Sequence, residues 1–402
     1  MKIIFRKPKK SIYFDHASAT QIDESVSKAM AKVANIFANG SAIHSAGVKA
    51  RTVIEDSRNK IAKYLFAHSD EIIFTGSGTE SDAFAIIGTV RAYKKGMPHV
   101  ITSEIEHPAV LENCKMLEEN GKAEVTYVKV NSKGVVEIKE IKDAFRDNTV
   151  LISIMYANNE IGTIQPIMEI AKVIRHFRKS NNTNLPLFHS DACQAMNYLP
   201  TENIEKLGVD MLTFNSSKIY GPKGVGVLYK KRGVSLNPIY VGGGQEFGLR
   251  SGTENTCAIV GTAKALEEAN KIKESESARL IKIRDYGIDK LLELGKISGY
   301  EIILNGDKEN RLPNNINITI PQIPSDLLVI ELSARGFMAS AKSACKSGDG
   351  KASHVIKAIN PDTKEEDGSL RFSLGINTNK KDIDYTFQSL TQILKKLSPW
   401  YK

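Results

Sequence analysis

The sequence predicts an α/β protein with a large, mainly parallel sheet and a smaller α+β domain. From residue 71 to about residue 230, short apolar or β-branched runs alternate with longer segments of helical period. That alternation is typical of parallel strands joined by crossover helices. A chain of 402 residues also exceeds what one hydrophobic core usually organises. We therefore expect a large domain over residues 15–262 and a small domain over residues 263–402, which the N-terminal segment 1–14 joins.

Seven short runs are expected to form the large sheet, because each is rich in apolar or β-branched residues. Segments with apolar positions at helical spacing separate several of these runs and are expected to be the crossover helices. Functional loops then belong at the ends of the strands. The expected strands are Glu71–Phe74, His99–Thr102, Glu124–Val128, Val150–Met155, Leu187–Ser190, Met211–Phe214 and Gly226–Tyr229. The expected helices include Ser81–Lys94, Ala109–Glu119, Ile138–Phe145 and Ile167–Lys179.

The character of the chain changes after the glycine run at 242–244. The segment from Thr262 to about Leu294 is highly charged, with apolar positions at helical spacing, and it predicts a long helix between the domains. Shorter elements follow it and suffice for a smaller α+β domain. They are expected at Ile302–Leu304, Asn315–Ile320, Ser325–Arg335, Leu370–Leu374 and Lys381–Leu397.

Composition and terminal sequence place the chain among soluble globular proteins. Hydrophobic residues make up 41% of the chain and charged residues 25%. No run approaches the roughly 18 apolar residues that a membrane helix needs. The segment Met1–Ser11 is basic and has too short an apolar cluster for a secretion signal. We expect a cytoplasmic protein that does not span a membrane.

The net charge of +9 does not by itself predict a nucleic-acid surface. The lysine pairs are dispersed along the chain and interleaved with acidic residues, and no nucleic-acid-binding module accompanies them. Direct nucleic-acid binding is therefore not expected. A solvated surface or an acidic partner accounts for the charge.

The four cysteines, at positions 114, 193, 257 and 345, have neither paired spacing nor the spacing of metal ligands. This pattern argues against a disulfide framework and against a zinc site. We expect no metal site, and each cysteine needs its own explanation.

Three segments could carry chemistry, and the first is the turn Thr75–Ser81 between an expected strand and an expected helix. Its small residues would let backbone N–H groups approach a phosphate, whose charge the helix N-terminus favours. An ordinary helix start explains the same residues. The second segment contains Asp191, which follows the expected strand Leu187–Ser190. Its carboxylate could hold a protonated ring nitrogen or simply cap a helix.

Lys218 completes the set, because it lies in an apolar turn locked by glycine and proline. A desolvated amine on a rigid mount suits a Schiff base with an aldehyde. A phosphate cradle, an acid for a ring nitrogen and an amine for an aldehyde together describe a site for pyridoxal phosphate.

The order of motifs resembles the cysteine desulfurases of the class V aminotransferase group, and the resemblance covers essentially the whole chain. It implies fold type I of the pyridoxal 5'-phosphate-dependent transferases. The length of the loop around Cys345 resembles that of the longer-loop enzymes of iron–sulfur assembly. The residues that carry it begin at Tyr13-Phe14-Asp15-His16-Ala17 and continue through Thr79-Glu80-Ser81, Glu106-His107, Asn158-Asn159-Glu160-Ile161-Gly162, Asp191-Ala192-x-Gln194, Lys218-Ile219-Tyr220-Gly221-Pro222-Lys223-Gly224, Gly242-Gly243-Gly244-Gln245-Glu246 and Arg250-Ser251-Gly252-Thr253.

This resemblance implies a role for each matching residue. Lys218 would carry the cofactor and move protons at the substrate α-carbon, His107 would stack on the ring, and Asp191 would pair with the pyridine nitrogen. The implied cofactor-binding residues are Gly78, Thr79, His107, Asn159, Asp191, Gln194, Asn215, Ser217, Lys218 and Thr253. The implied substrate-binding residues are Asn39, Asn159 and Arg371. Thr253 would reach the site of a second subunit, which implies a homodimer.

Cys345 distinguishes a desulfurase from a plain aminotransferase. It lies in a stretch of small residues that is expected to be a mobile loop, unlike the apolar setting of a structural cysteine. The resemblance implies that its thiol takes sulfur from L-cysteine, leaving L-alanine. A sulfur acceptor such as an iron–sulfur scaffold or a tRNA-thiolation protein would receive the persulfide. Lys342 and Lys346 could lower the pKa of the thiol.

Two positions depart from the family pattern near the cofactor. Asn215 and Ser217 stand where the family usually has serine or threonine and histidine, and Ser217 cannot supply the charge of a protonated imidazole. We therefore expect weaker cofactor retention. Two other readings stay open: a selenocysteine lyase or other class V lyase, and an interaction protein that keeps the fold without turnover.

Overall fold

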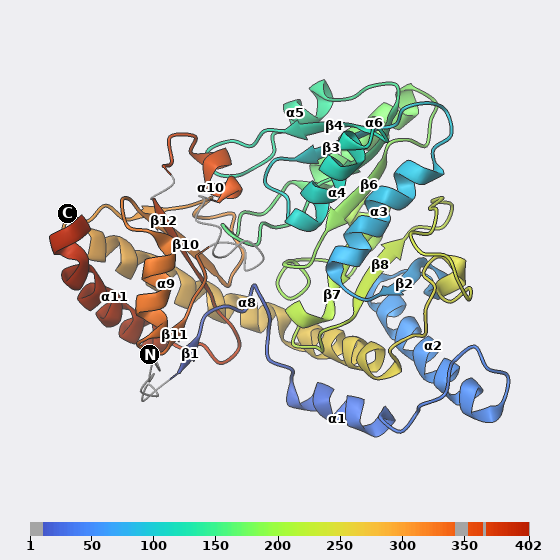
Figure 1. The fold of residues 1–402 in the computed structure, drawn as a ribbon, viewed down its shortest axis with the longest axis horizontal. Coiled ribbons are helices and arrows are strands. Elements are labelled where there is room, and N and C mark those ends of the chain that lie inside the picture. The colour runs from blue at the N-terminus through green and yellow to red at the C-terminus, as the bar shows by residue number, and fades with distance from the viewer. Residues whose placement is uncertain (1–10, 342–352, 365–366, 402) are drawn as a thin grey trace.

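The computed structural model describes residues 11–341, 353–364 and 367–401 of the chain. Its largest element is a seven-stranded sheet in the order β2-β8-β7-β6-β5-β3-β4 (Figure 1). Neighbouring strands run parallel except that β8 is antiparallel to both β2 and β7. The expected α/β class and the mainly parallel sheet are confirmed. The strands are β2 (Ile72–Thr75), β3 (His99–Ser103), β4 (Glu124–Val128), β5 (Thr149–Ser153), β6 (Leu187–Asp191), β7 (Met211–Asn215) and β8 (Gly226–Lys230).

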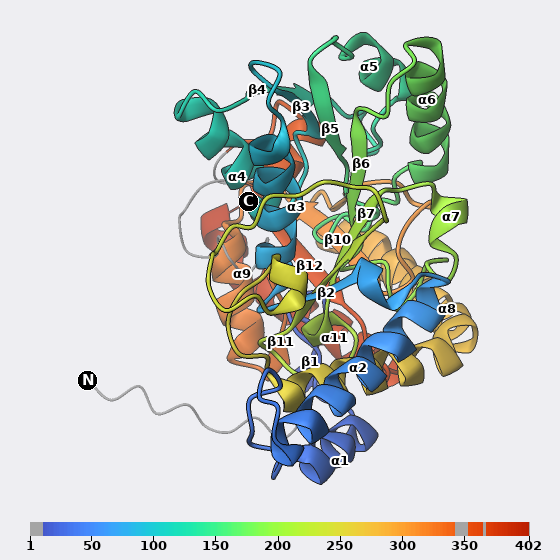
Figure 2. The ribbon, with the colours of Figure 1, turned by 90° about the vertical axis from the view of Figure 1, so that its right-hand side faces the viewer.

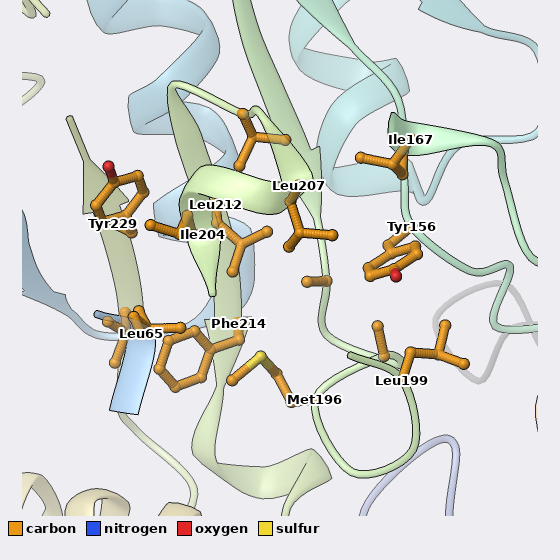
Figure 3. Packing of buried hydrophobic residues seen from close by; sticks show 14 of the residues in the cluster. Leu65, Tyr156, Ile167, Met196, Leu199, Ile204, Leu207, Leu212, Phe214 and Tyr229 are labelled. Atoms are coloured by element: carbon orange, nitrogen blue, oxygen red, sulfur yellow. The ribbon is translucent and has the colours of Figure 1, made fainter. Parts of the chain in front are cut away.

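Successive residues of these strands point to opposite faces, and both faces are buried. Val100, Leu151 and Met211 pack beneath α3 (Gly78–Ala92) and α4 (Pro108–Glu119). The alternate residues face α2 (Ser45–Leu65), α6 (Ile167–Ser180) and the first part of α8 (Thr256–Ser298). Figure 2 shows α3 and α4 on one side of the strands and α6 on the other. Figure 3 shows how Leu212 and Phe214 of β7 contribute to the second of these cores.

The C-terminal part is built on a three-stranded antiparallel sheet in the order β12-β10-β9. Its strands are β9 (Ile303–Leu304), β10 (Asn315–Ile320) and β12 (Gly368–Ser373). Apolar residues of the sheet pack with α9 (Ser325–Ser333), α11 (Lys380–Tyr401) and the second part of α8. Near the N-terminus, β1 (Ile12–Tyr13) pairs in parallel with β11 (Phe337–Met338), so this segment joins the C-terminal part.

The long helix α8 extends into both parts of the molecule (Figure 1). It covers 43 residues and is longer than the expected helix at both ends. The Asn255 side chain caps its start by accepting from Ala258 N, and Gly299 ends it in the left-handed conformation with φ of 72°. The boundary that we expected between residues 262 and 263 therefore falls inside one helix. We propose two domains that share α8.

Sequence patterns missed several of the helices. The chain from residue 24 to 65 forms α1 (Glu24–Val33) and α2, which pack against α8 and the sheet. Shorter helices occur at α5 (Ile138–Asp143), α7 (Ile204–Leu207) and α10 (His354–Ile359), of which only α5 was expected. No helix in the described ranges is long and apolar enough to cross a membrane.

Candidate active site

A cavity of about 190 Å³ opens at the carboxyl ends of the parallel strands. The loops after β2, β3, β5, β6 and β7 all contribute to its wall, and β12 and the N-terminal segment close it from the other part of the molecule. Parallel sheets collect ligand-binding groups at this edge. The lining residues are Ala17, Ser18, Ser77, Gly78, Thr79, Asp82, His107, Met155, Ala157, Asn159, Asp191, Cys193, Gln194, Asn215, Lys218 and Arg371.

The first turn of α3 presents bare backbone to this cavity. Ser77 caps the helix by accepting from Glu80 N at 3.1 Å, so α3 begins three residues before the expected Ser81. A β-carbon at Gly78 would lie 2.8 Å from Asn215 Nδ2 and 3.1 Å from Cys193 Sγ. Only glycine fits there without displacing those side chains. The unpaired N–H groups and the positive end of the helix make this a place for an anion such as a phosphate.

Asp191 and Lys218 approach the cavity from adjacent strands. Asp191 ends β6, and its Oδ1 accepts a hydrogen bond from Cys193 N at 2.8 Å, which orients the carboxylate. Lys218 follows β7 in the 3₁₀ turn Ser216–Lys218, and its Nζ donates to Ser18 O. Asn197 Nδ2 holds the backbone of Lys218 at 2.6 Å. The sheet therefore brings together an acid and an amine that are separated by 26 residues in the sequence.

His107 lies at the N-terminus of α4 on the cavity wall. Its Nδ1 accepts from Ala109 N at 3.1 Å, so a proton on the neutral ring is on Nε2. Burial lowers the pKa of His107, and the charge of Lys218 acts in the same direction while Asp191 opposes it. The imidazole is therefore neutral at neutral pH.

Arg371 reaches the cavity from β12 and is 1% exposed. Its Nη2 donates to Asp15 Oδ1 at 2.6 Å, and its Nη1 donates to Asn159 O at 2.9 Å. Nε has no hydrogen-bond partner among the residues that the structure describes. A buried guanidinium with unused N–H groups beside a polar cavity can bind a carboxylate.

Comparison with known proteins agrees with this geometry. The family model of class-V aminotransferases matches residues 12–386. The chain belongs to the class-V aminotransferase family. A cysteine desulfurase IscS from Dictyoglomus turgidum is 43% identical over 390 residues, which cover 97% of this chain and 96% of that protein.

Solved structures of similar proteins support the same family membership. A NifS-like protein superposes with a TM-score of 0.87 and 34% identity, over 96% of this chain and all of the other. A structure titled SspA in complex with cysteine has a TM-score of 0.75 and 34% identity, over 90% and 99% of the two chains. The predicted family, its fold type and its dependence on pyridoxal phosphate are confirmed.

The chemistry of the described cavity residues, considered apart from these comparisons, also fits pyridoxal phosphate. The bare first turn of α3 suits the phosphate, the oriented carboxylate of Asp191 suits a protonated pyridine nitrogen, and the Lys218 amine lies on the same wall. These three groups line one cavity.

Most of the residues expected in the site line the cavity. They are Gly78, Thr79, His107, Asn159, Asp191, Gln194, Asn215, Lys218 and Arg371. Gln194 is held there because its Nε2 donates to Ala17 O at 2.9 Å.

Three expected residues, Ser217, Asn39 and Thr253, are described by the structure but are not part of the cavity wall. Ser217 instead donates to Asn215 Oδ1 at 3.0 Å. Asn39 is exposed between α1 and α2, and Thr253 is exposed before α8. Cys345, with Lys342 and Lys346, lies outside the described residues.

Other residues that line the cavity were missed by sequence reasoning. Asp82 follows Gly78 and Thr79 by one helical turn, and that spacing alone could have placed it on the same face. Cys193, for which no role was predicted from the sequence, lines the cavity beside Asp191. Ser18 had no signal, because only the tertiary structure brings the N-terminal segment to Lys218.

Proposed function

We propose that this enzyme is a cysteine desulfurase that converts L-cysteine to L-alanine and retains the sulfur as a persulfide on Cys345. One observation carries the proposal: Lys218, Asp191, the first turn of α3 and Arg371 line the same cavity. Its relatives over nearly the full chain are cysteine desulfurases. The same residues would serve other class-V lyases, so Cys345 is the residue that favours a cysteine desulfurase.

Each cavity residue has a task in this proposal. Pyridoxal phosphate, when bound, supplies an acceptor for the electron pair released at the substrate α-carbon. Lys218 would hold it and move a proton at that carbon, while Asp191 would pair with its ring nitrogen. His107 is neutral with its proton on Nε2, so this nitrogen would take part in proton transfer at the substrate. Gly78 and Thr79 would bind the phosphate, and Gln194 and Asn159 lie on the wall beside them.

Arg371 would bind the carboxylate of L-cysteine. The guanidinium is fixed in place by Asp15 and by the carbonyl of Asn159, so little side-chain freedom is lost when the substrate binds. Orienting the amino acid in this way would present its side-chain sulfur toward the mouth of the cavity, where a thiol from the chain could approach it.

The positions of the described flanking residues would allow Cys345 to reach the cavity. Ser340 exchanges backbone hydrogen bonds of 3.2 and 2.7 Å with Arg371, and five residues span at most about 18 Å. On the other side, Ser353 Oγ donates to Glu160 Oε2 at 2.5 Å, and His354 Nε2 lies 3.1 Å from Glu106 O. Both flanks of the segment that carries Cys345 are therefore attached beside the cavity.

The sulfur transfer balances without an added oxidant. The Cys345 thiolate attacks the substrate sulfur, an S–S bond forms and the C–S bond breaks. The electron pair of that bond stays on the carbon skeleton, which takes up a proton and leaves as alanine. The persulfide is then passed to an acceptor, for which we propose a protein such as an iron–sulfur scaffold or a tRNA-thiolation partner in the cytoplasm.

The test is a mass measurement on the holoenzyme after L-cysteine is added. We expect one additional sulfur on the peptide that contains Cys345. Cys345→Ser should keep the visible absorption of the bound cofactor but form no persulfide and release no sulfide with a thiol present. A selenocysteine lyase would leave the Cys345 peptide unmodified with cysteine. A protein without turnover would leave the substrate unchanged.

We also propose that the enzyme is a homodimer in which Thr253 completes the site of the partner subunit. Apolar side chains are exposed in two loops. Phe37, before α2, is 90% exposed and Val241, after β8, is 88% exposed. These loops would meet the second copy. Thr253 is exposed and off the cavity of its own chain, as a residue that serves a second site would be.

Mixed dimers test the shared site. A Lys218→Ala subunit and a Thr253→Ala subunit should each bind the cofactor poorly as homodimers. Their mixed dimer should hold one cofactor with the affinity of the wild type, because one site then has both residues. Equal, weak binding in all three dimers would show that Thr253 serves its own subunit.

A further inference from the structure

The wall of the cavity contains a second carboxyl group besides Asp191. Asp82 lies one turn into α3, is 1% exposed, and lines the same cavity. Its Oδ1 has no hydrogen-bond partner among the described residues. A buried carboxylate without a donor or a cation is strongly unfavourable, so the protonation state of Asp82 needs an explanation.

The strand register shows why Asp82 faces Asp191. Residues two apart on β6 share a face of the sheet, so His189 and Asp191 point the same way. Thr213 of β7 is the register partner of Asp191 and shares that face. It is the face that α3 covers, since Met211 packs there with residues of α3. Asp82 is therefore enclosed between α3 and this row of polar side chains.

None of the groups that face Asp82 in the described part of the chain offers a compensating charge. His189 Nε2 lies 3.7 Å from Asp82 Oδ1, but burial lowers the pKa of His189 to about 4, so the ring is neutral at neutral pH. Both ring nitrogens already have hydroxyl partners, Ser153 Oγ at 2.9 Å and Thr213 Oγ1 at 3.0 Å. The ionisable groups that act on Asp82 from β6, the loop after β3 and the loop after β6 are Asp191, Glu106, His189 and Cys193.

Geometry and charge both indicate that the Asp82 carboxyl group is protonated. Burial, and after it the charge of Asp191, raise the pKa of Asp82 well above its ordinary value. Thr213 is the one hydrogen-bonding side chain that favours the ionised form. Two carboxyl groups in one desolvated wall cannot both ionise at little cost, and the more deeply enclosed one keeps its proton.

We propose that Asp82 is a positioning residue of the cofactor site that stays neutral, so that Asp191 is the single negative charge presented to the ring nitrogen. The proposal rests on the role given to Asp191 above. A protonated carboxyl can donate through one oxygen and accept through the other, as an amide side chain does. It fills the polar space behind Asp191, excludes water from it, and adds no second charge.

Three variants of the full-length holoenzyme test this assignment. Asp82→Asn keeps the shape and the neutral donor–acceptor pair, so its dissociation constant for pyridoxal phosphate and its visible absorption spectrum should stay within about twofold of the wild type. Asp82→Ala leaves the polar row without its partner, and its dissociation constant should rise about tenfold. Asp191→Asn is the control and should lose more, together with a changed spectrum.

Infrared difference spectroscopy gives the protonation state directly. The spectrum of the wild type minus that of Asp82→Asn at neutral pH should show the C=O stretch of a protonated carboxyl group, while the contribution of Glu106 cancels. A carboxylate signal, or an Asn variant as impaired as the Ala variant, would overturn the neutral assignment. An Ala variant with wild-type affinity would overturn the positioning role. Neither readout uses cysteine or Cys345, so these outcomes are independent of whether the enzyme is a desulfurase.

Discussion

Arg371 combines nearly complete burial with a positive charge, and its environment explains why this is stable. Asp15 neutralises the guanidinium and the carbonyl of Asn159 fixes its plane. We expect Arg371→Lys to raise the KM for L-cysteine about tenfold, since a lysine keeps the charge but loses the fork that binds carboxylates. The absorption spectrum of the bound cofactor should be retained.

Steady-state kinetics against a matched surface variant measure this effect. Arg232→Lys is a suitable control, because Arg232 pairs with Asp70 on the surface at 2.8 Å. Its KM should equal that of the wild type. An Arg371→Lys enzyme with an unchanged KM would show that the substrate carboxylate is bound by another group.

Glu106 predicts how stability depends on pH. It is buried against Ser103 Oγ at 2.6 Å and Met155 N at 3.0 Å, and burial raises its pKa to about 8. The folded protein then holds a proton that the unfolded chain has released, so this group makes stability fall as pH rises from about 4.5 to about 8, by up to ~1.4 kcal/mol per pH unit.

Replacing that carboxyl group should remove its part of the pH dependence. Glu106→Gln cannot ionise and keeps an acceptor for Met155 N, so its free energy of unfolding should fall less steeply between pH 5 and 8. Urea unfolding at several pH values measures this. Glu119→Gln, on the exposed end of α4, is the control and should follow the wild type. Parallel curves for all three proteins would contradict the prediction.

At the scale of elements, one buried ion pair joins α2 to the loop that precedes α8. Arg58 donates to Glu246 through two bonds of 2.7 Å and also to Ile72 O at 2.6 Å. Glu246 in turn accepts from Phe74 N at 2.7 Å. The pair therefore fixes β2, α2 and the Gly242–Glu246 segment together at the edge of the sheet.

Breaking this pair should be costly because it leaves a buried charge unpaired. We expect Glu246→Ala to lower the free energy of unfolding by about 3–5 kcal/mol. Asp70→Ala breaks the exposed pair with Arg232 and should cost about 0–1 kcal/mol. Chemical unfolding of both variants measures the difference. Equal losses would mean that burial does not set the strength of the Arg58–Glu246 pair.

Strand and helix patterns predicted most elements, but not their exact ends. The seven strands of the large sheet were expected within one or two residues, because buried parallel strands read as short apolar runs. Capping moved the starts of α3 and α8, where Ser77 and Asn255 supply side-chain acceptors. No element was expected between Glu24 and Leu65, where the structure has α1 and α2.

At the scale of the whole molecule, exposed apolar side chains suggest where a second copy would bind. Val241 lies in the loop after β8, and Phe37 and Ile43 lie in the loop before α2, all at least 88% exposed. Val241→Asp should therefore weaken the proposed dimer, because a charge would have to be desolvated at its interface. Sedimentation at several protein concentrations should show more monomer for this variant.

Cofactor occupancy provides a second measurement of the same variant. If Thr253 completes the partner's site, the monomer should retain less pyridoxal phosphate than the dimer. Ile330→Asp is the control, since Ile330 is 64% exposed on α9, away from these loops. An unchanged oligomeric state for Val241→Asp would place the interface elsewhere.

By itself the sequence determined the fold class and the family, and it predicted cofactor-binding residues most of which line one cavity. Apolar periodicity predicts strands and helices locally, and the motifs around Gly78, Asp191 and Lys218 each lie at a strand end, where a parallel sheet collects functional groups. Only the tertiary structure decided what surrounds those groups. Contacts between positions far apart in the chain enclose Asp82, pair Asp15 with Arg371 and bring Ser18 to Lys218. Desolvation and charge compensation depend on such contacts, and no local pattern encodes them.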